Sequence, residues 1–169
     1  MNAEYTDVIN LDGEEIRGSH KAVQLPFKRL SARALVVRRG DGAILGTLHR
    51  AGGRYALPGG APEDGESTLG AVLRELEEEQ IQLIDPDSSY EGDLVVDYFE
   101  GYGELSVWHL FLVEDARIRE SEENVETRWI AQEEDAWYPS IHEKLLMAIS
   151  RHMPGLNTSS VTVGPSNTR

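Results

Sequence analysis

The chain has 169 residues, 40% of them hydrophobic, which is the size and composition of a single globular domain with an apolar core. Its formal net charge of −14 argues against nucleic-acid polymers and anionic membranes as partners, because both would be repelled. It contains no cysteine, so disulfides, thiolate metal ligands and cysteine nucleophiles are excluded.

Residues 1–29 are expected to form a small hairpin and a connector ahead of the main domain. Apolar residues flank Asp12-Gly13, a dipeptide that favours a tight hairpin turn. The first ten residues lack the basic and apolar regions of a secretory signal, and no apolar run approaches the ~20 residues of a membrane span. We therefore expect a cytoplasmic protein. Residues 1–29 could also reach a partner subunit, so the sequence leaves a homodimer open.

Residues 30–153 are expected to form the main domain, and residues 154–169, rich in Ser, Asn, Thr and Gly, a flexible tail. The predicted elements of the main domain are, in chain order, strands over 31–39, 43–50 and 55–60, a helix over 67–80, strands over 93–100 and 104–114, a strand over 126–131 and a helix over 141–153. Ser67 or Thr68 can cap the first helix. Strands, helix, strands and helix in this order indicate the α/β class, of the α+β type, with a largely non-alternating sheet.

The helix predicted over 67–80 gathers like charges that must be offset by something. On a helical wheel, one side carries an apolar stripe formed by Leu69, Val72, Leu73 and Leu76. The strip beside it carries three carboxylates, those of Glu75, Glu78 and Glu79. Glu77 falls on the other side and is expected to be solvated. Like charges at this spacing destabilise a helix by a few tenths of a kcal/mol per pair. Magnesium prefers oxygen ligands and would remove that repulsion, so the pattern predicts a metal site.

The residues before the helix support this interpretation. Gly59 and Gly60 let the backbone bend sharply and bring a carbonyl close to the same carboxylates. Glu66 follows the loop, and Arg74 can pair with it or with a neighbouring glutamate. The alternative is a solvated acidic helix face, which is the usual meaning of a glutamate run, but the spacing of the whole set favours a site.

The spacing Gly60, Glu66, Arg74-Glu75, apolar Leu76 and Glu78-Glu79 resembles the Nudix box, so residues 60–82 look like those of the MutT-like Nudix hydrolases. The resemblance implies a mixed β-sheet sandwiched between helices. It also implies hydrolysis of a nucleoside diphosphate linked to another moiety, with Mg²⁺ or Mn²⁺ as the cofactor. The one departure is Ile81, which stands where the family has a glycine in a left-handed conformation at the end of the helix. A β-branched residue resists that conformation, so we expect the helix to run on towards Asp85-Pro86.

The resemblance also implies roles for individual residues. Glu78 and Glu79 would be metal ligands close to the carbonyl of Gly59. Glu75 would be a further ligand or the general base. Glu66 and Arg74 would complete the catalytic set by orienting the loop and the helix.

A later segment offers one more ligand by the same resemblance. Nudix enzymes often use an acidic residue from a later loop, and Glu126 precedes Trp129 as in the family's acidic-then-tryptophan strand. Glu126 is therefore an expected metal ligand. Glu122 and Glu123 are expected to be solvated, and Trp129 to pack in the core.

The candidate substrate-binding residues are Arg50, Arg54, Gly60 and Tyr98. The planar fork of arginine suits phosphate, although a surface arginine often serves solubility alone. Tyr98 lies near the place where family members put a stacking aromatic, but aromatic residues are also ordinary in strands. His109, in an apolar strand, is expected to be a core residue rather than a ligand.

Hydrolysis of a diphosphate puts water on phosphorus while negative charge collects on oxygen, which metal ions neutralise and a carboxylate assists by taking a proton. An acidic helix would bind the metals that bind the phosphates, which reconciles the charge of −14 with an anionic substrate. We expect a pyrophosphohydrolase acting on a nucleoside triphosphate or a nucleoside diphosphate derivative. The alternative is a non-catalytic, nucleotide-sensing Nudix domain, which Ile81 favours and the intact glutamates oppose. An isoprenoid-diphosphate isomerase is set aside because its usual cysteine is missing.

Overall fold

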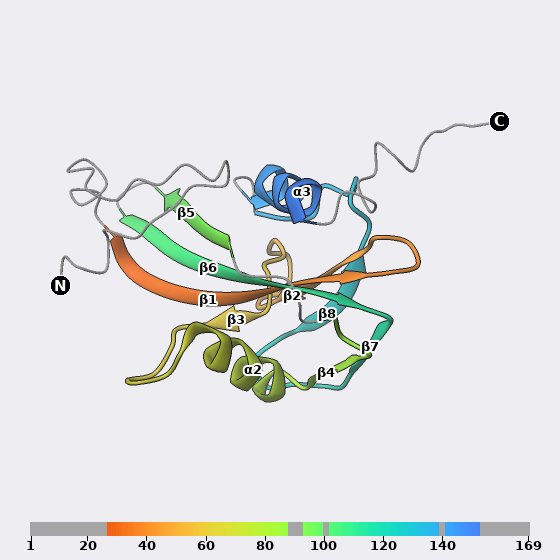
Figure 1. Ribbon diagram of the computed structural model, residues 1–169, viewed down its shortest axis with the longest axis horizontal. Helices are drawn as coiled ribbons and strands as arrows, with labels where there is room; N and C mark the ends of the chain where they lie inside the picture. The colour runs from red at the N-terminus through yellow and green to blue at the C-terminus, as the bar shows by residue number, and fades with distance from the viewer. Residues whose placement is uncertain (1–26, 88–92, 100–101, 139–140, 153–169) are drawn as a thin grey trace.

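The computed structural model describes residues 27–87, 93–99, 102–138 and 141–152. Within them, a mixed β-sheet is covered by one helix on each face (Figure 1). This is the expected α/β architecture of the α+β type. The predicted N-terminal hairpin and C-terminal tail lie outside the described residues.

The main sheet has the strand order β5-β6-β1-β2-β8, and the short strand β3 pairs with β1 beside it. The strands are β1 (Phe27–Arg38), β2 (Ile44–Leu48), β3 (Gly59–Gly60), β5 (Asp93–Phe99), β6 (Tyr102–Val113) and β8 (Glu126–Ile130). β1 and β6 run parallel over eleven residue pairs, whereas the other pairings are antiparallel. β1 begins at Phe27, four residues before the predicted strand, and the predicted pairing of the strands around Gly101 is confirmed by β5 and β6.

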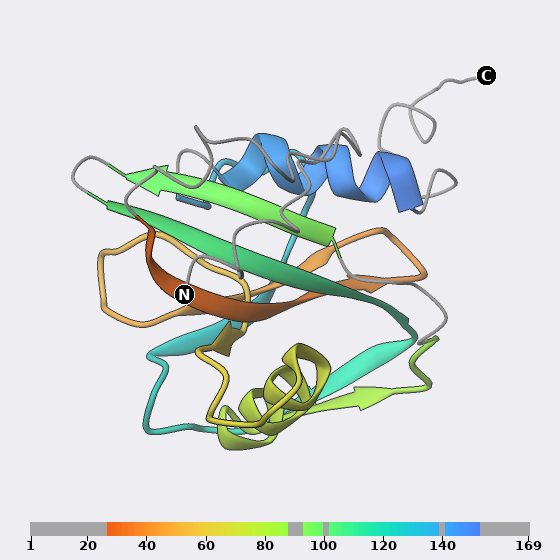
Figure 2. The same ribbon diagram turned by 60° about the vertical axis from the view of Figure 1, so that its left-hand side comes forward.

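The two faces of the sheet build two cores. Along β1, Ala34 and Val36 join the core beneath helix α2 (Thr68–Glu78), while Leu35 and Val37 join the core beneath helix α3 (Ile141–His152). All four side chains are fully buried. A strand that is covered on both faces carries apolar residues at successive positions, as β1 does. Figure 2 shows α2 and α3 on opposite sides of the sheet, so the alternation of side chains decides which core each residue enters.

Helix α2 begins at a capped end, as predicted. The Oγ of Ser67 accepts a hydrogen bond of 2.9 Å from the backbone N–H of Gly70. Val72 and Leu76 are buried, but Leu69 and Leu73 are 44% and 51% exposed, so the predicted apolar stripe is only half covered. Both exposed leucines line a groove of about 770 Å³ between the helix and residues of the segments 81–86 and 117–119.

The expectation that α2 runs on towards Asp85-Pro86 is wrong. The helix ends at Glu78, Gln80 adopts a left-handed φ of 63°, and Ile81 opens strand β4 (Ile81–Ile84). A left-handed backbone costs about 1–2 kcal/mol at a residue with a Cβ. The unbranched Gln80 adopts this conformation one position before the family's glycine. Ile81, which is 5% exposed, is thereby free to enter the core beneath α2.

Strand β4 pairs antiparallel with β7 (Asp115–Ile118) in a separate two-stranded sheet that the sequence analysis missed. Each strand has four residues, too few for an alternating pattern to stand out. In both views this small sheet lies on the same side of the main sheet as α2 (Figures 1 and 2). Neither helix of the described residues is long and apolar enough to cross a membrane.

Candidate active site

Two glycines bring the backbone of β3 against both the sheet and the helix. Gly59 has φ +147°, and a Cβ at this residue would lie 2.2 Å from the carbonyl oxygen of Ala32 on β1. A Cβ at Gly60 would instead lie 2.5 Å from Oε2 of Glu75 on α2. Gly59 is thus required by the sheet, whereas Gly60 leaves room for a carboxylate.

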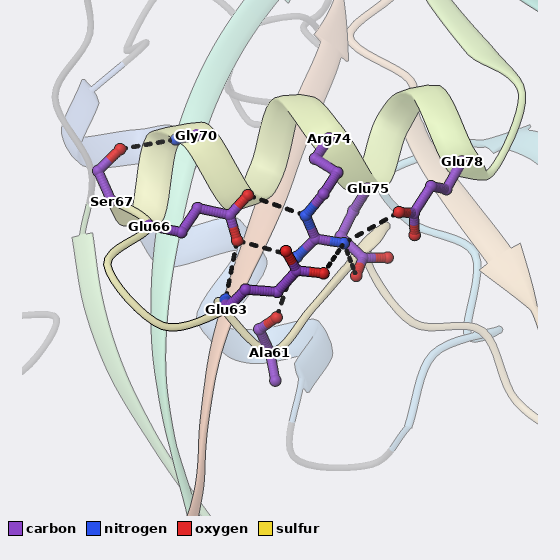
Figure 3. Close-up of polar contacts among 8 residues, drawn as sticks. All are labelled: Ala61, Glu63, Glu66, Ser67, Gly70, Arg74, Glu75 and Glu78. Atoms are coloured by element: carbon purple, nitrogen blue, oxygen red, sulfur yellow. Dashed lines mark hydrogen bonds and ion pairs between the residues drawn. The ribbon is translucent and has the colours of Figure 1, made fainter.

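Arg74 is the hub that joins the loop before α2 to the helix (Figure 3). Its Nε and Nη2 donate to the two carboxylate oxygens of Glu66 at 2.8 and 3.0 Å, and Nη2 also donates to the carbonyl of Ala61. Its Nη1 donates to Glu75 at 3.2 Å and to Glu78 at 3.1 Å. The hydrogen bonds from Arg74 are the main reason that the pKa of Glu66 is lowered. One guanidinium therefore fixes three of the predicted site carboxylates.

Glu79 is the most unusual carboxylate of the site because it is buried, with 1% of its surface exposed. The backbone N–H of Gly59 donates to its Oε2 at 3.2 Å, and the side-chain amide of Asn124 donates to its Oε1 at 3.0 Å. Burial raises the pKa of Glu79 to about 7 and outweighs the hydrogen bonds from Asn124 and Gly59, which lower it; the nearby Glu75 and Glu123 raise it further by smaller amounts. A cation bound beside this carboxylate would favour its ionised form.

Glu75, Glu79 and Glu123 each place a carboxylate oxygen within 4.8 Å of the other two. Glu123 comes from the loop 119–125 between β7 and β8. The Oγ of Ser121 fixes this loop by accepting hydrogen bonds from the backbone N–H groups of Glu123 and Asn124. Three hard oxygen donors gathered in this way suit a divalent cation such as Mg²⁺ or Mn²⁺. The Oδ1 of Asn124 is buried beside them without a hydrogen-bond partner in the described residues, which also fits a site completed by a ligand.

Two expected metal ligands lie elsewhere. The carboxylate of Glu78 is 44% exposed and turned to Arg74. Glu126 is paired with Leu48, a residue of the α3-side core, and accepts a hydrogen bond from the hydroxyl of Tyr55. Neither belongs to the group of three, whereas Glu123, expected to be solvated, does.

Local geometry explains why Glu123, and not Glu126, lies beside Glu75 and Glu79. Alternation along β8 sends Glu126 to the sheet face opposite α2. The preceding loop is free of that constraint and carries Glu123 to the helix. The signal for Glu123 in the sequence was only its place three residues before Glu126.

Two of the candidate substrate residues, Arg50 and Arg54, lie in the loop that follows β2. Arg50 is exposed, and Arg54 forms an ion pair of 3.1 Å with Asp135. Gly60 faces the carboxylate of Glu75, as described above. The side chain of Tyr98 on β5 lies outside the described part of the structure.

A polar network on the α3 side was not predicted from the sequence. The guanidinium of Arg128 lies 4.8 Å from the centre of the Tyr55 ring, donates to its hydroxyl and pairs with Glu134 at 2.6 Å. Burial is the main reason that the pKa of Tyr55 is raised. These residues fix the orientation of Glu126, which explains why that carboxylate is not free to turn towards α2.

Two residues expected in the core have structural partners. Trp129 packs against the α2-side core under the guanidinium of Arg38, which lies 4.6 Å from the ring centre. His109 is half-buried, shares a hydrogen bond of 2.9 Å with Thr68, and has its pKa lowered by burial. Neither side chain belongs to the group of three carboxylates.

The described geometry can bind a cation and place it beside a glycine backbone. The oxygens of Glu75, Glu79 and Glu123 would hold the ion, and the missing Cβ of Gly60 leaves space next to Glu75. Arg74 holds the carboxylates of Glu75 and Glu78 by ion pairs. Such an arrangement suits substrates with phosphate groups, because a bound divalent ion can accept phosphate oxygens in its open positions.

Comparison with known proteins identifies the same region. The model of the NUDIX domain matches residues 27–148. No curated protein sequence shows significant similarity to the chain. Among solved structures, a MutT NUDIX hydrolase from Burkholderia pseudomallei is 26% identical, with a TM-score of 0.51, and the match covers 69% of this chain and 95% of that one.

Two further structures show the same fold at lower identity. A MutT protein from Methanosarcina mazei Go1 is 19% identical with a TM-score of 0.52, over 72% of this chain and 92% of that one. An Ap4A hydrolase of C. elegans, in a binary complex, is 18% identical with a TM-score of 0.54, over 70% of this chain and 93% of that one.

Proposed function

The chain belongs to the NUDIX domain family, and from that premise we propose that this Nudix-type pyrophosphohydrolase cleaves a diphosphate linkage in a nucleoside triphosphate or a nucleoside diphosphate derivative, with Mg²⁺ or Mn²⁺. The observation that carries the proposal is the group formed by Glu75, Glu79 and Glu123 beside the Gly59-Gly60 backbone. The structural similarity to an Ap4A hydrolase of C. elegans supports a nucleotide as the substrate class.

The proposed metal ligands are the carboxylates of Glu75, Glu79 and Glu123. Bound there, the cation would neutralise charge on phosphate oxygens and make a coordinated water more acidic. The protein's own part is to hold those oxygens at short range in spite of their repulsion. The backbone N–H of Gly59 and the side-chain amide of Asn124 hold Glu79, and the guanidinium of Arg74 holds Glu75.

The remaining catalytic residues act on position and on protons. Glu66 and Arg74 fix the loop against the helix, as their paired hydrogen bonds support. Glu78 is exposed at the rim, where it can accept a proton from water or bind a second ion brought by the substrate. The carbonyl of Gly59 stays a proposed ligand, since its backbone lies against Glu79.

Substrate contacts are proposed at Arg50 and Tyr98, with Gly60 leaving room for the diphosphate. Arg50 is exposed and can reach a phosphate, whereas Arg54 would first have to leave Asp135. For Glu126 the contact with Tyr55 supports a role in fixing the loop rather than in metal binding. A cytoplasmic location and a homodimer remain proposals, the latter open to a test by light scattering.

The test is hydrolysis of a nucleotide panel: canonical and oxidised nucleoside triphosphates, ADP-ribose, nucleotide sugars and dinucleoside polyphosphates. The protein is assayed with Mg²⁺, with Mn²⁺ and with EDTA. We expect metal-dependent release of a nucleoside monophosphate from one class, reduced at least 100-fold in Glu79→Gln and Glu75→Gln. Glu77→Gln is the matched control, because Glu77 is an exposed glutamate of the same helix outside the group of three.

Tight binding of a nucleotide without turnover of any member of the panel would contradict the proposal and support the sensing alternative. That alternative drew on Ile81. In the structure Gln80 takes the left-handed conformation and Glu79 still faces Gly59, so no specific observation favours a sensor.

A further inference from the structure

We propose that Asn124 is a positioning residue that holds the carboxylate of Glu79 in the orientation needed for the cation, an inference that rests on the proposed metal-dependent function. Asn124 belongs to no motif recognised in the sequence. It follows directly after Glu123 in the loop 119–125 and is half-buried.

The two oxygens of Glu79 are held from different parts of the chain. The backbone N–H of Gly59 donates to Oε2 at 3.2 Å, and the Nδ2 of Asn124 donates to Oε1 at 3.0 Å. One donor would leave the carboxylate free to rotate about its last side-chain bond. Two donors, one on each oxygen, fix the plane of the group, and with it the direction of the lone pairs that remain for a metal ion.

The loop that carries Asn124 is itself anchored. The backbone N–H of Arg119 donates to the carbonyl of Gln80 at 3.0 Å, just after α2. At the other end, the N–H of Val125 donates to the carbonyl of Leu48 at 2.7 Å, at the end of β2. Ser121 accepts the N–H of Asn124 between these points at 3.3 Å. The amide of Asn124 is therefore presented by backbone contacts that need no metal.

An amide suits this position better than a carboxylate. Glu75, Glu79 and Glu123 already place three acidic oxygens within 4.8 Å of one another. A neutral donor can orient Glu79 without adding charge or competing for the ion. The Oδ1 of Asn124 has less than 1 Å² of exposed surface and no hydrogen-bond partner in the described residues, so it is available to accept a hydrogen bond from a water bound to the ion.

The experiment measures Mn²⁺ binding directly, without nucleotide, from the electron paramagnetic resonance signal of free Mn²⁺. The proteins are wild type, Asn124→Ala, Glu79→Gln and the double variant. Loss of a group that orients a ligand commonly weakens metal binding 10- to 100-fold. We expect at least a 10-fold weaker Kd for Asn124→Ala. In the Glu79→Gln background, we expect the same change to alter Kd by less than about twofold, because Asn124 acts through Glu79.

Val125→Ala is the matched control, since Val125 lies in the same loop but is 59% exposed. It should bind Mn²⁺ as the wild type does. In the hydrolysis assay, Asn124→Ala should raise the metal concentration for half-maximal rate, with a smaller effect on kcat at saturating metal. If Asn124→Ala does not fold, as judged by circular dichroism, Asn124→Ser replaces it, because serine keeps a polar side chain too short to reach Glu79.

Wild-type affinity in Asn124→Ala, or an equal loss in both backgrounds, would overturn the inference. Failure of the proposed function is separate. It would appear as absence of hydrolysis by the wild type, while the Mn²⁺ titration, which needs no substrate, would still decide the role of Asn124.

Discussion

At the scale of single residues, Glu79 shows most directly the cost of burying a carboxylate close to other acidic groups. Its carboxyl is buried beside Glu75 and Glu123, so the ionised form is disfavoured in the folded protein unless a cation is present. The two hydrogen bonds from Gly59 and Asn124 reduce that cost without removing it. The residue is therefore expected to make stability depend on pH and on metal.

The first prediction concerns pH in the presence of EDTA. Because burial raises the pKa of Glu79 to about 7, the folded protein binds this proton more tightly than the unfolded chain. The stabilisation is fully present below the usual carboxyl pKa, falls as the pH rises, and is lost above about pH 7. Its full size is on the order of 3 kcal/mol. Urea unfolding at pH 4 to 8 should show this extra fall in wild type relative to Glu79→Gln, and parallel curves for the two proteins would contradict it.

The second prediction separates the two glycines. Gly59→Ala would place a Cβ 2.2 Å from the backbone oxygen of Ala32 at a φ of +147°, so we expect a loss of about 3 kcal/mol in the free energy of unfolding. Gly60→Ala would meet only the end of the Glu75 side chain, which can move. It should cost less than about 1 kcal/mol but lower kcat/KM at least 10-fold. Unfolding and kinetics of both variants provide the check, and a reversed order would refute it.

At the scale of elements, the end of α2 decides where Glu79 points. The helix stops at Glu78, Gln80 turns the chain with φ 63°, and β4 begins at Ile81. The turn also contacts the start of the loop 119–125, because the backbone N–H of Arg119 donates to the carbonyl of Gln80. One turn thus links the helix that carries Glu75 to the loop that supplies Glu123.

The third prediction uses this turn. Gln80→Gly should stabilise the protein by about 1 kcal/mol, because glycine adopts a left-handed φ without strain. Ile81→Gly, which restores the family's glycine at its own position, should destabilise by about 3 kcal/mol or more, because Ile81 is 5% exposed in the core. Thermal and urea unfolding measure both. A stabilising Ile81→Gly would show that the left-handed residue is misassigned.

At the scale of the whole molecule, the acidic site belongs to a chain that is acidic overall. The formal net charge is −14, and the three clustered carboxylates come from the C-terminal part of α2, its cap and the loop 119–125. A divalent cation would relieve local repulsion within the cluster and reduce the total charge. The folded state should therefore bind such an ion far better than the unfolded chain, in which the three residues are separated.

The fourth prediction follows by mass action. At neutral pH, Mg²⁺ or Mn²⁺ at 100 times its Kd should stabilise the folded protein by about 2.7 kcal/mol, and raise Tm by about 5–10 °C for a chain of this size. The shift should disappear in a Glu79→Gln/Glu123→Gln variant and persist in Glu77→Gln. Differential scanning calorimetry gives the shifts. A metal-independent Tm in wild type would argue against the site.

The sequence by itself determined the elements whose signal lies within a few residues. Ser67 caps the helix because its side chain needs only the N–H three residues on, and the strands around β1 follow from apolar runs. The helical spacing placed Glu75 and Glu79 near each other, and the short loop before α2 brings Gly59 to Glu79 and Gly60 to Glu75.

Tertiary structure alone decided the relations between segments distant in the chain. Glu123 rather than Glu126 reaches Glu75 and Glu79, because alternation along β8 turns Glu126 to the other face while the preceding loop is anchored at Gln80 and Leu48. The exposure of Leu73 and the entry of Ile81 into the core depend in the same way on what packs against them. A local pattern cannot encode which of several carboxylates meets a helix more than forty residues away, because that is set by the path of the backbone through the packed sheet.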